Sequence, residues 1–146
     1  VIIDPGDEPK HIIEEVGQLD VKGILLTHGH YDHIGAVNAL RDYYNTKVYA
    51  TKDTSDMLLN WDENLSVMLG GEKYIVDDVE IITDCLTLGD MYFKIYETPG
   101  HAKGSCLYYY EEENAGDYDE CPDGSRRVFR CNCLCRCRQQ DTDCWI

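Results

Sequence analysis

Histidine and carboxylate side chains crowd into one short stretch near the start of the chain. Four residues of the segment Thr27–His33 can bind a metal ion, namely His28, His30, Asp32 and His33. Side chains two residues apart in an extended segment project to one side, so His28 and His30 can reach the same ion. Imidazole and carboxylate without thiolate suit zinc first, with iron or manganese as alternatives. A polar loop rich in histidine is the competing interpretation, but three of the chain's five histidines fall here, which favours a metal site.

A further histidine, His101, follows the Pro99-Gly100 turn, which can present it at the end of another strand. Taken alone, such a residue is more typical of a surface loop than of a metal site. Together with the first cluster, it supplies the third imidazole of a catalytic site that keeps one coordination position open. His11 falls in a predicted helix, and we interpret it as structural.

The elements before the histidine cluster form a strand–helix–strand pattern. Residues 1–3 form a short strand that ends at the Asp4-Pro5-Gly6 turn, and a helix is expected from about 8 to 17. The apolar run over 23–26 is typical of a strand buried on both faces, and it leads directly into the histidines. Such a unit predicts parallel strands with a right-handed crossover, and loops at the carboxyl ends of parallel strands commonly carry the site.

Downstream, we expect one helix, a strand, one or two short helices and then a β-rich part. The helix is predicted from Ile34, Val37, Leu40 and Tyr44 at helical spacing, and the strand covers 47–50. The short helices fall between 53 and 71. From Tyr74 onward the pattern turns to strands. A hairpin is predicted at Gly89-Asp90, between strands over 86–88 and 91–96, and a last strand covers 105–111.

Three motifs in order resemble those of the metallo-β-lactamase-fold hydrolases. They are His28-Gly29-His30-Tyr31-Asp32-His33, the earlier Ile2-Ile3-Asp4-Pro5-Gly6 and the later segment Thr98–Ser105. The compact spacing looks closest to the glyoxalase II-like thioesterases. The resemblance implies an α/β fold, an αββα sandwich over residues 1–114. We expect a partial chain, incomplete at both ends.

The resemblance also implies two adjacent metal ions. The first would be held by His28, His30 and His101, and the second by Asp32, His33 and ligands further downstream. Asp4 would be a buried residue that orients the ligand loop rather than binding metal. Asp117, in Gly116-Asp117, is the candidate for the carboxylate that bridges the metals, although the strand expected before it is missing. No histidine follows His101, so we expect the second site to be incomplete in this chain.

Composition limits the partners. A formal net charge of −15 argues against nucleic acid, because binding to phosphate backbones depends on surface Lys and Arg. No run of 18 apolar residues predicts a membrane span, and the N-terminal residues do not resemble a signal peptide. We expect a cytoplasmic protein that acts on a small-molecule substrate. Its oligomeric state is left open.

Residues 115–146 differ in composition from the rest of the chain. Six of the eight cysteines lie there, and every basic residue is an arginine. A metallothionein-like cluster or disulfides are alternatives, but two separated Cys-x-x-Cys pairs are the usual pattern of a structural zinc site. The preferred interpretation is a shifted reading frame near Asn114, which leaves a tail without fixed structure.

The most direct functional interpretation is hydrolysis of an ester or thioester, as by a hydroxyacylglutathione hydrolase. A metal-bound water whose pKa falls to about 7 would attack the acyl carbon. Asp32 is the predicted catalytic residue, which positions the hydroxide and moves its proton. The alternatives are a mono-iron sulfur dioxygenase of the same fold, a β-lactamase and an inactive metal-binding fragment. The substrate-binding parts are expected beyond residue 146.

Overall fold

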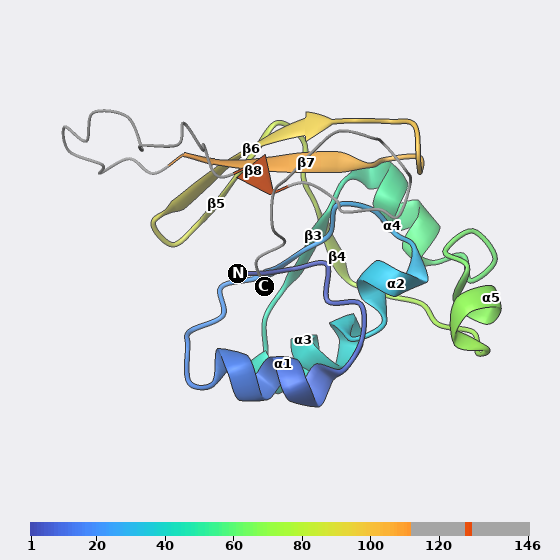
Figure 1. The fold of residues 1–146 in the computed structure, drawn as a ribbon. Helices are drawn as coiled ribbons and strands as arrows, with labels where there is room; N and C mark the ends of the chain where they lie inside the picture. The colour runs from blue at the N-terminus through green and yellow to red at the C-terminus, as the bar shows by residue number, and fades with distance from the viewer. Residues whose placement is uncertain (112–127, 130–146) are drawn as a thin grey trace, which may run out of the picture.

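A computed structural model describes residues 1–111 and 128–129, which form two four-stranded sheets (Figure 1). The first sheet is parallel, in the order β1-β2-β3-β4. Its strands are β1 (Ile2–Ile3), β2 (Ile24–Leu25), β3 (Val48–Ala50) and β4 (Val79–Ile81). The predicted parallel pairing of the first two strands is confirmed, with Ile3 opposite Leu25.

The second sheet is antiparallel, in the order β5-β6-β7-β8. Its strands are β5 (Cys85–Leu88), β6 (Met91–Glu97), β7 (Cys106–Glu111) and β8 (Val128–Phe129). Leu88 pairs with Met91, so the two-residue turn between them is confirmed, and Gly89 has the φ of +64° that such a turn requires. Of the segment predicted to lack fixed structure, the structure describes β8, and the other residues lie outside the described part.

Five helices lie in the described part of the chain. They are α1 (Pro9–Val16), α2 (Tyr31–Ile34), α3 (Val37–Tyr44), α4 (Lys52–Leu58) and α5 (Ser66–Gly70). Figure 1 shows α1 and α3 side by side beneath the first sheet, with the second sheet on the opposite side. None of these helices is long and apolar enough to cross a membrane.

The prediction of one helix through Ile34 and Tyr44 was wrong, because the chain forms two helices here. The break falls at Gly35 and Ala36, where the Ala36 N–H donates to the carbonyl of Pro5 at 3.0 Å. A Cβ built on Gly35 would lie 2.2 Å from the Gly6 carbonyl oxygen. The turn after β1 therefore packs directly against Gly35 and Ala36, and this tertiary contact ends α2.

The two faces of β2 contribute to two different cores. Ile24 and Leu26 belong to the cluster between the first sheet and its helices, whereas Leu25 belongs to the cluster between the two sheets. All three residues are fully buried, which confirms the prediction of a strand covered on both sides. The layers are helices, sheet and sheet. In the described residues, helices do not cover the outer face of the second sheet, so the αββα sandwich is partial.

Candidate metal centre

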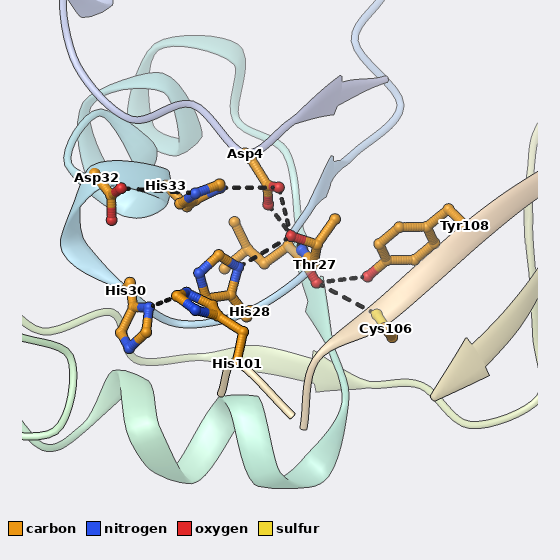
Figure 2. A network of polar contacts seen from close by, with 10 residues as sticks. Asp4, Thr27, His28, His30, Asp32, His33, His101, Cys106 and Tyr108 are labelled. Carbon is orange, nitrogen blue, oxygen red and sulfur yellow. Dashed lines mark hydrogen bonds and ion pairs between the residues drawn. The ribbon is translucent and has the colours of Figure 1, made fainter. Parts of the chain in front are cut away.

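The candidate ligands meet at the carboxyl end of β2 and come from two segments that are far apart in the sequence (Figure 2). His28 and His30 lie in the loop that follows β2, and Asp32 and His33 lie in α2. His101 comes from the loop between β6 and β7, 71 residues after His30. This is the edge of the sheet where the sequence predicted the site.

Three imidazoles converge on one point. Candidate ligand atoms of His28, His30 and His101 all lie within 4.8 Å of one another, and Nδ1 of His30 lies 2.9 Å from Nε2 of His101. Two nitrogens bound tetrahedrally to zinc at 2.0–2.1 Å would lie about 3.3 Å apart. Small side-chain rotations therefore suffice to place all three nitrogens around one ion, so the donor set fits zinc or iron.

Thr27 fixes the orientation of His28. The Thr27 hydroxyl donates its single proton to Oδ2 of Asp4 at 2.6 Å, so it can only accept from Nδ1 of His28, which lies 3.2 Å away. Nδ1 of His28 then carries the proton, and Nε2 carries the lone pair that a metal requires. We assign this tautomer from the hydrogen bonds.

Asp4 also contacts the second group of candidate ligands. Its Oδ1 accepts the Thr27 N–H at 2.7 Å, and its Oδ2 lies 3.1 Å from Nδ1 of His33. These contacts occupy both oxygens of Asp4, which supports its predicted role in orienting the ligand loop. Nε2 of His33 faces Oδ2 of the exposed Asp32, 3.8 Å away, so these two candidate ligands lie side by side.

The electrostatic environment keeps two of the imidazoles neutral. Burial, reinforced by the neighbouring histidines His33, His30 and His101, lowers the pKa of His28 to about 3. Burial and the charge of His101 lower the pKa of His30. For His33, burial opposes protonation, but the hydrogen bond and charge of Asp4 outweigh it and raise the pKa. Because His28 and His30 are neutral near pH 7, they need not release a proton to bind a metal.

The second sheet anchors the ligand loop from the other side. The Cys106 N–H donates to the carbonyl of Thr27 at 2.9 Å, and the Tyr108 hydroxyl donates to the carbonyl of Leu26 at 2.8 Å. Burial raises the pKa of the Cys106 thiol to about 12, so this cysteine stays protonated at neutral pH. It is a packing residue beside the site.

Sequence reasoning missed the role of Thr27. A usable signal was present, since Ile3 pairs with Leu25 in parallel β1 and β2. Asp4 and Thr27 both follow these paired residues within two positions, so a carboxylate and a hydroxyl leave neighbouring strands at the same edge. The other predicted ligand, Asp117, lies outside the described residues, as do the cysteines of the tail.

Comparison with known proteins relates the chain to the metallo-beta-lactamase superfamily and to hydrolases. Residues 1–115 match the family model of the metallo-beta-lactamase superfamily. The chain is 38% identical over 124 residues to an uncharacterized protein of Aquifex aeolicus, covering 80% of this chain and 58% of that protein. It is 34% identical over 118 residues to the probable metallo-hydrolase YqgX of Bacillus subtilis, covering 77% and 56%. A hydroxyacylglutathione hydrolase of Wigglesworthia glossinidia brevipalpis is 31% identical over 112 residues, covering 75% and 37%.

Solved structures with a similar fold include a metallo-beta-lactamase. The BLEG-1 B3 metallo-beta-lactamase superposes with a TM-score of 0.66 at 37% identity, covering 74% of this chain and 55% of that one. The protein TTHA1623, solved in a di-iron-bound form, superposes with a TM-score of 0.61 at 29% identity, covering 73% and 54%. The chain spans a little over half the length of the first two curated relatives that it matches. With its two sheets, its helix layer and the histidine motif at the end of β2, the chain belongs to the metallo-beta-lactamase superfamily.

Proposed function

We propose that this chain carries a metal-dependent hydrolase centre that cleaves an ester or thioester bond in a small molecule. The observation that carries the proposal is the convergence of His28, His30 and His101 from two loops far apart in the sequence. Three imidazole ligands that leave a coordination position open are typical of catalytic zinc sites rather than structural ones.

A zinc ion held by these imidazoles would supply hydroxide at neutral pH, by lowering the pKa of its water from 15.7 to about 7, and would polarise the acyl oxygen. We assign the proton transfer to Asp32. Its carboxylate is exposed at the site and lies 3.8 Å from Nε2 of His33, so it can take up a proton from water and pass it on. Asp4 and Thr27 would not bind the metal themselves. They hold His28 and His33 in the tautomers that bind metal.

The relatives support this choice of chemistry. Several are hydroxyacylglutathione hydrolases, at about 30% identity, and another is a probable polyketide biosynthesis zinc-dependent hydrolase of Bacillus subtilis. The BLEG-1 structure, at 37% identity, favours β-lactam hydrolysis as a second candidate, since both reactions add hydroxide to an acyl carbon. The di-iron form of TTHA1623 keeps iron beside zinc as a candidate metal. A mono-iron sulfur dioxygenase is the redox alternative, and it would hold one iron ion per chain.

The test is an assay of the zinc-loaded chain against a hydroxyacylglutathione thioester and against a chromogenic cephalosporin. We expect slow thioester cleavage, because the proposed second site is incomplete. Within the described residues its candidate ligands are Asp32 and His33, without the further ligands expected downstream. Asp32→Asn should abolish this turnover, while Asp42→Asn, a change at an exposed position on α3, should leave it intact.

Thioester cleavage that Asp32→Asn leaves unchanged would remove Asp32 from the mechanism. Cleavage of the cephalosporin alone would select the second candidate. Activity that requires iron and consumes oxygen would point to the dioxygenase.

A further inference from the structure

The three clustered imidazoles differ in how the fold holds them. His28 lies three residues after the end of β2 and is fully buried, whereas His101 is exposed on the loop that joins β6 to β7. Metal sites with tight geometry need supporting residues that fix their ligands, and a ligand on a loop needs this support most. The contacts of the His101 loop therefore show how the site keeps its shape.

Hydrogen bonds within the loop set its conformation. The Thr98 N–H donates to the carbonyl of Ser105 at 2.7 Å, and the Ser105 hydroxyl donates to the carbonyl of Ala102 at 2.9 Å. These bonds tie the loop to itself. They do not determine how far His101 lies from the other two imidazoles, which belong to a different segment.

A second set of contacts binds the loop to α4. The Gly104 carbonyl accepts hydrogen bonds from the hydroxyls of Thr51 at 2.7 Å and Thr54 at 3.0 Å, and both threonines are almost completely buried. Gly104 has a φ of +80°, and a Cβ built on it would lie 2.5 Å from the Thr54 nitrogen. The loop backbone thus meets the start of α4 at a distance that only glycine permits.

Helix α4 touches the other ligand loop as well. A Cβ built on Gly29, between His28 and His30, would lie 3.2 Å from Cγ of the buried Met57. One short helix therefore contacts both segments that carry the imidazoles, and Figure 1 shows it beside the loop between β6 and β7.

We propose that Thr51 and Thr54 are positioning residues, which set the place of His101 by binding the Gly104 carbonyl. The proposal rests on the metal-binding role proposed above for His101. Helix capping explains part of the arrangement, because the Thr51 hydroxyl accepts the Thr54 N–H at 3.4 Å. Capping does not explain the hydroxyl of Thr54, which lies 3.1 Å from the Thr51 hydroxyl and donates to the Gly104 carbonyl, 50 positions further along the chain.

The experiment compares three variants of the full chain. Thr54→Val removes the hydroxyl at nearly constant volume, and Thr54→Ser keeps it. Lys103→Ala is the control on the same loop, since Lys103 is exposed and pairs with Asp53 at the surface at 3.0 Å, an interaction worth little. Thermal unfolding checks that each variant folds, and competition with a chromogenic chelator measures zinc affinity.

We expect Thr54→Val to weaken zinc binding about ten-fold, as loss of a residue that supports a ligand does, and Thr54→Ser and Lys103→Ala to match the parent chain. Equal zinc affinity in Thr54→Val and the parent chain would overturn the proposal. Weakening in Thr54→Ser as large as in Thr54→Val would do the same, because the hydroxyl would then not matter.

Hydrogen exchange of the metal-free chain gives a readout that does not depend on zinc. The amides of Ser105 and Cys106 should be protected in the parent chain and exchange faster in Thr54→Val. If the parent chain binds no zinc but this difference appears, the metal assignment fails while the support of the loop stands. Unprotected amides in the parent chain would overturn the proposal, even if Thr54→Val does not fold.

Discussion

Replacing Asp4 by asparagine should change which nitrogens of two histidines carry a proton. Three donors point at the Asp4 carboxylate: the Thr27 N–H, the Thr27 hydroxyl and Nδ1 of His33. An asparagine that keeps its oxygen toward the Thr27 N–H turns its own NH₂ toward the other two groups. The Thr27 hydroxyl must then donate to Nδ1 of His28, and Nδ1 of His33 must accept. Both rings would carry their proton on Nε2, the nitrogen assigned to the metal.

The size of the effect follows from the bonds that change. A hydrogen bond to a charged group contributes about 1.5–3 kcal/mol, and the variant replaces three such bonds by weaker bonds to a neutral amide. We expect the free energy of unfolding of the metal-free protein to fall by about 1.5–3 kcal/mol. Zinc affinity should fall about 10–100-fold, because a ligand loses the partner that sets its tautomer.

Chelator competition measures the zinc affinity, and urea unfolding measures the stability. Asp78→Asn is a matched control, because Asp78 is exposed and has a φ of +53°, close to the +49° of Asp4. The control should leave both quantities within error of the parent chain. An Asp4→Asn chain that binds zinc as tightly as the parent chain would refute the tautomer argument.

Three further predictions concern packing, pH and cysteine reactivity. Gly6→Ala should lower the free energy of unfolding by about 1–3 kcal/mol or more, because its Cβ would lie 1.9 Å from the carbonyl oxygen of Asp32; urea unfolding checks this. The free energy of unfolding of the metal-free chain should fall as the pH is lowered from 6.5 toward 3. His28 contributes up to about 1.4 kcal/mol per pH unit to this fall, because its imidazole takes up a proton in the unfolded state but stays neutral in the folded state. Urea unfolding of His28→Gln should show a shallower pH slope, and an unchanged slope would contradict the assignment. Iodoacetamide at pH 8 should modify the exposed Cys85 and spare the buried Cys106 of the folded chain, as peptide mass spectrometry would show.

The fold around the site was predictable because its signals are local. The apolar run that ends at Leu26 indicates a strand buried on both faces, and the first histidine of the cluster, His28, follows two residues later. Parallel pairing with the first strand then brings Asp4 beside Thr27. Residue types and chain order were enough to place the ligand loop at the carboxyl edge of the sheet.

The rest depends on contacts between distant segments. The helix break at Gly35 comes from the approach of the Gly6 carbonyl, which helical periodicity does not encode. The support of His101 likewise depends on Thr54 and Gly104, 50 residues apart, and neither residue type indicates a partner by itself. Such pairings appear only when the distant segments are packed together in the folded chain.

The proposed function depends on one metal ion held by His28, His30 and His101. The most direct measurement is the metal content of the purified chain by elemental mass spectrometry, with His30→Ala as the test and His11→Ala, an exposed histidine on α1, as the control. The parent chain and His11→Ala should carry about one tightly held zinc or iron ion each, and His30→Ala should lose most of it. Unchanged metal content in His30→Ala would show that these imidazoles do not hold the ion.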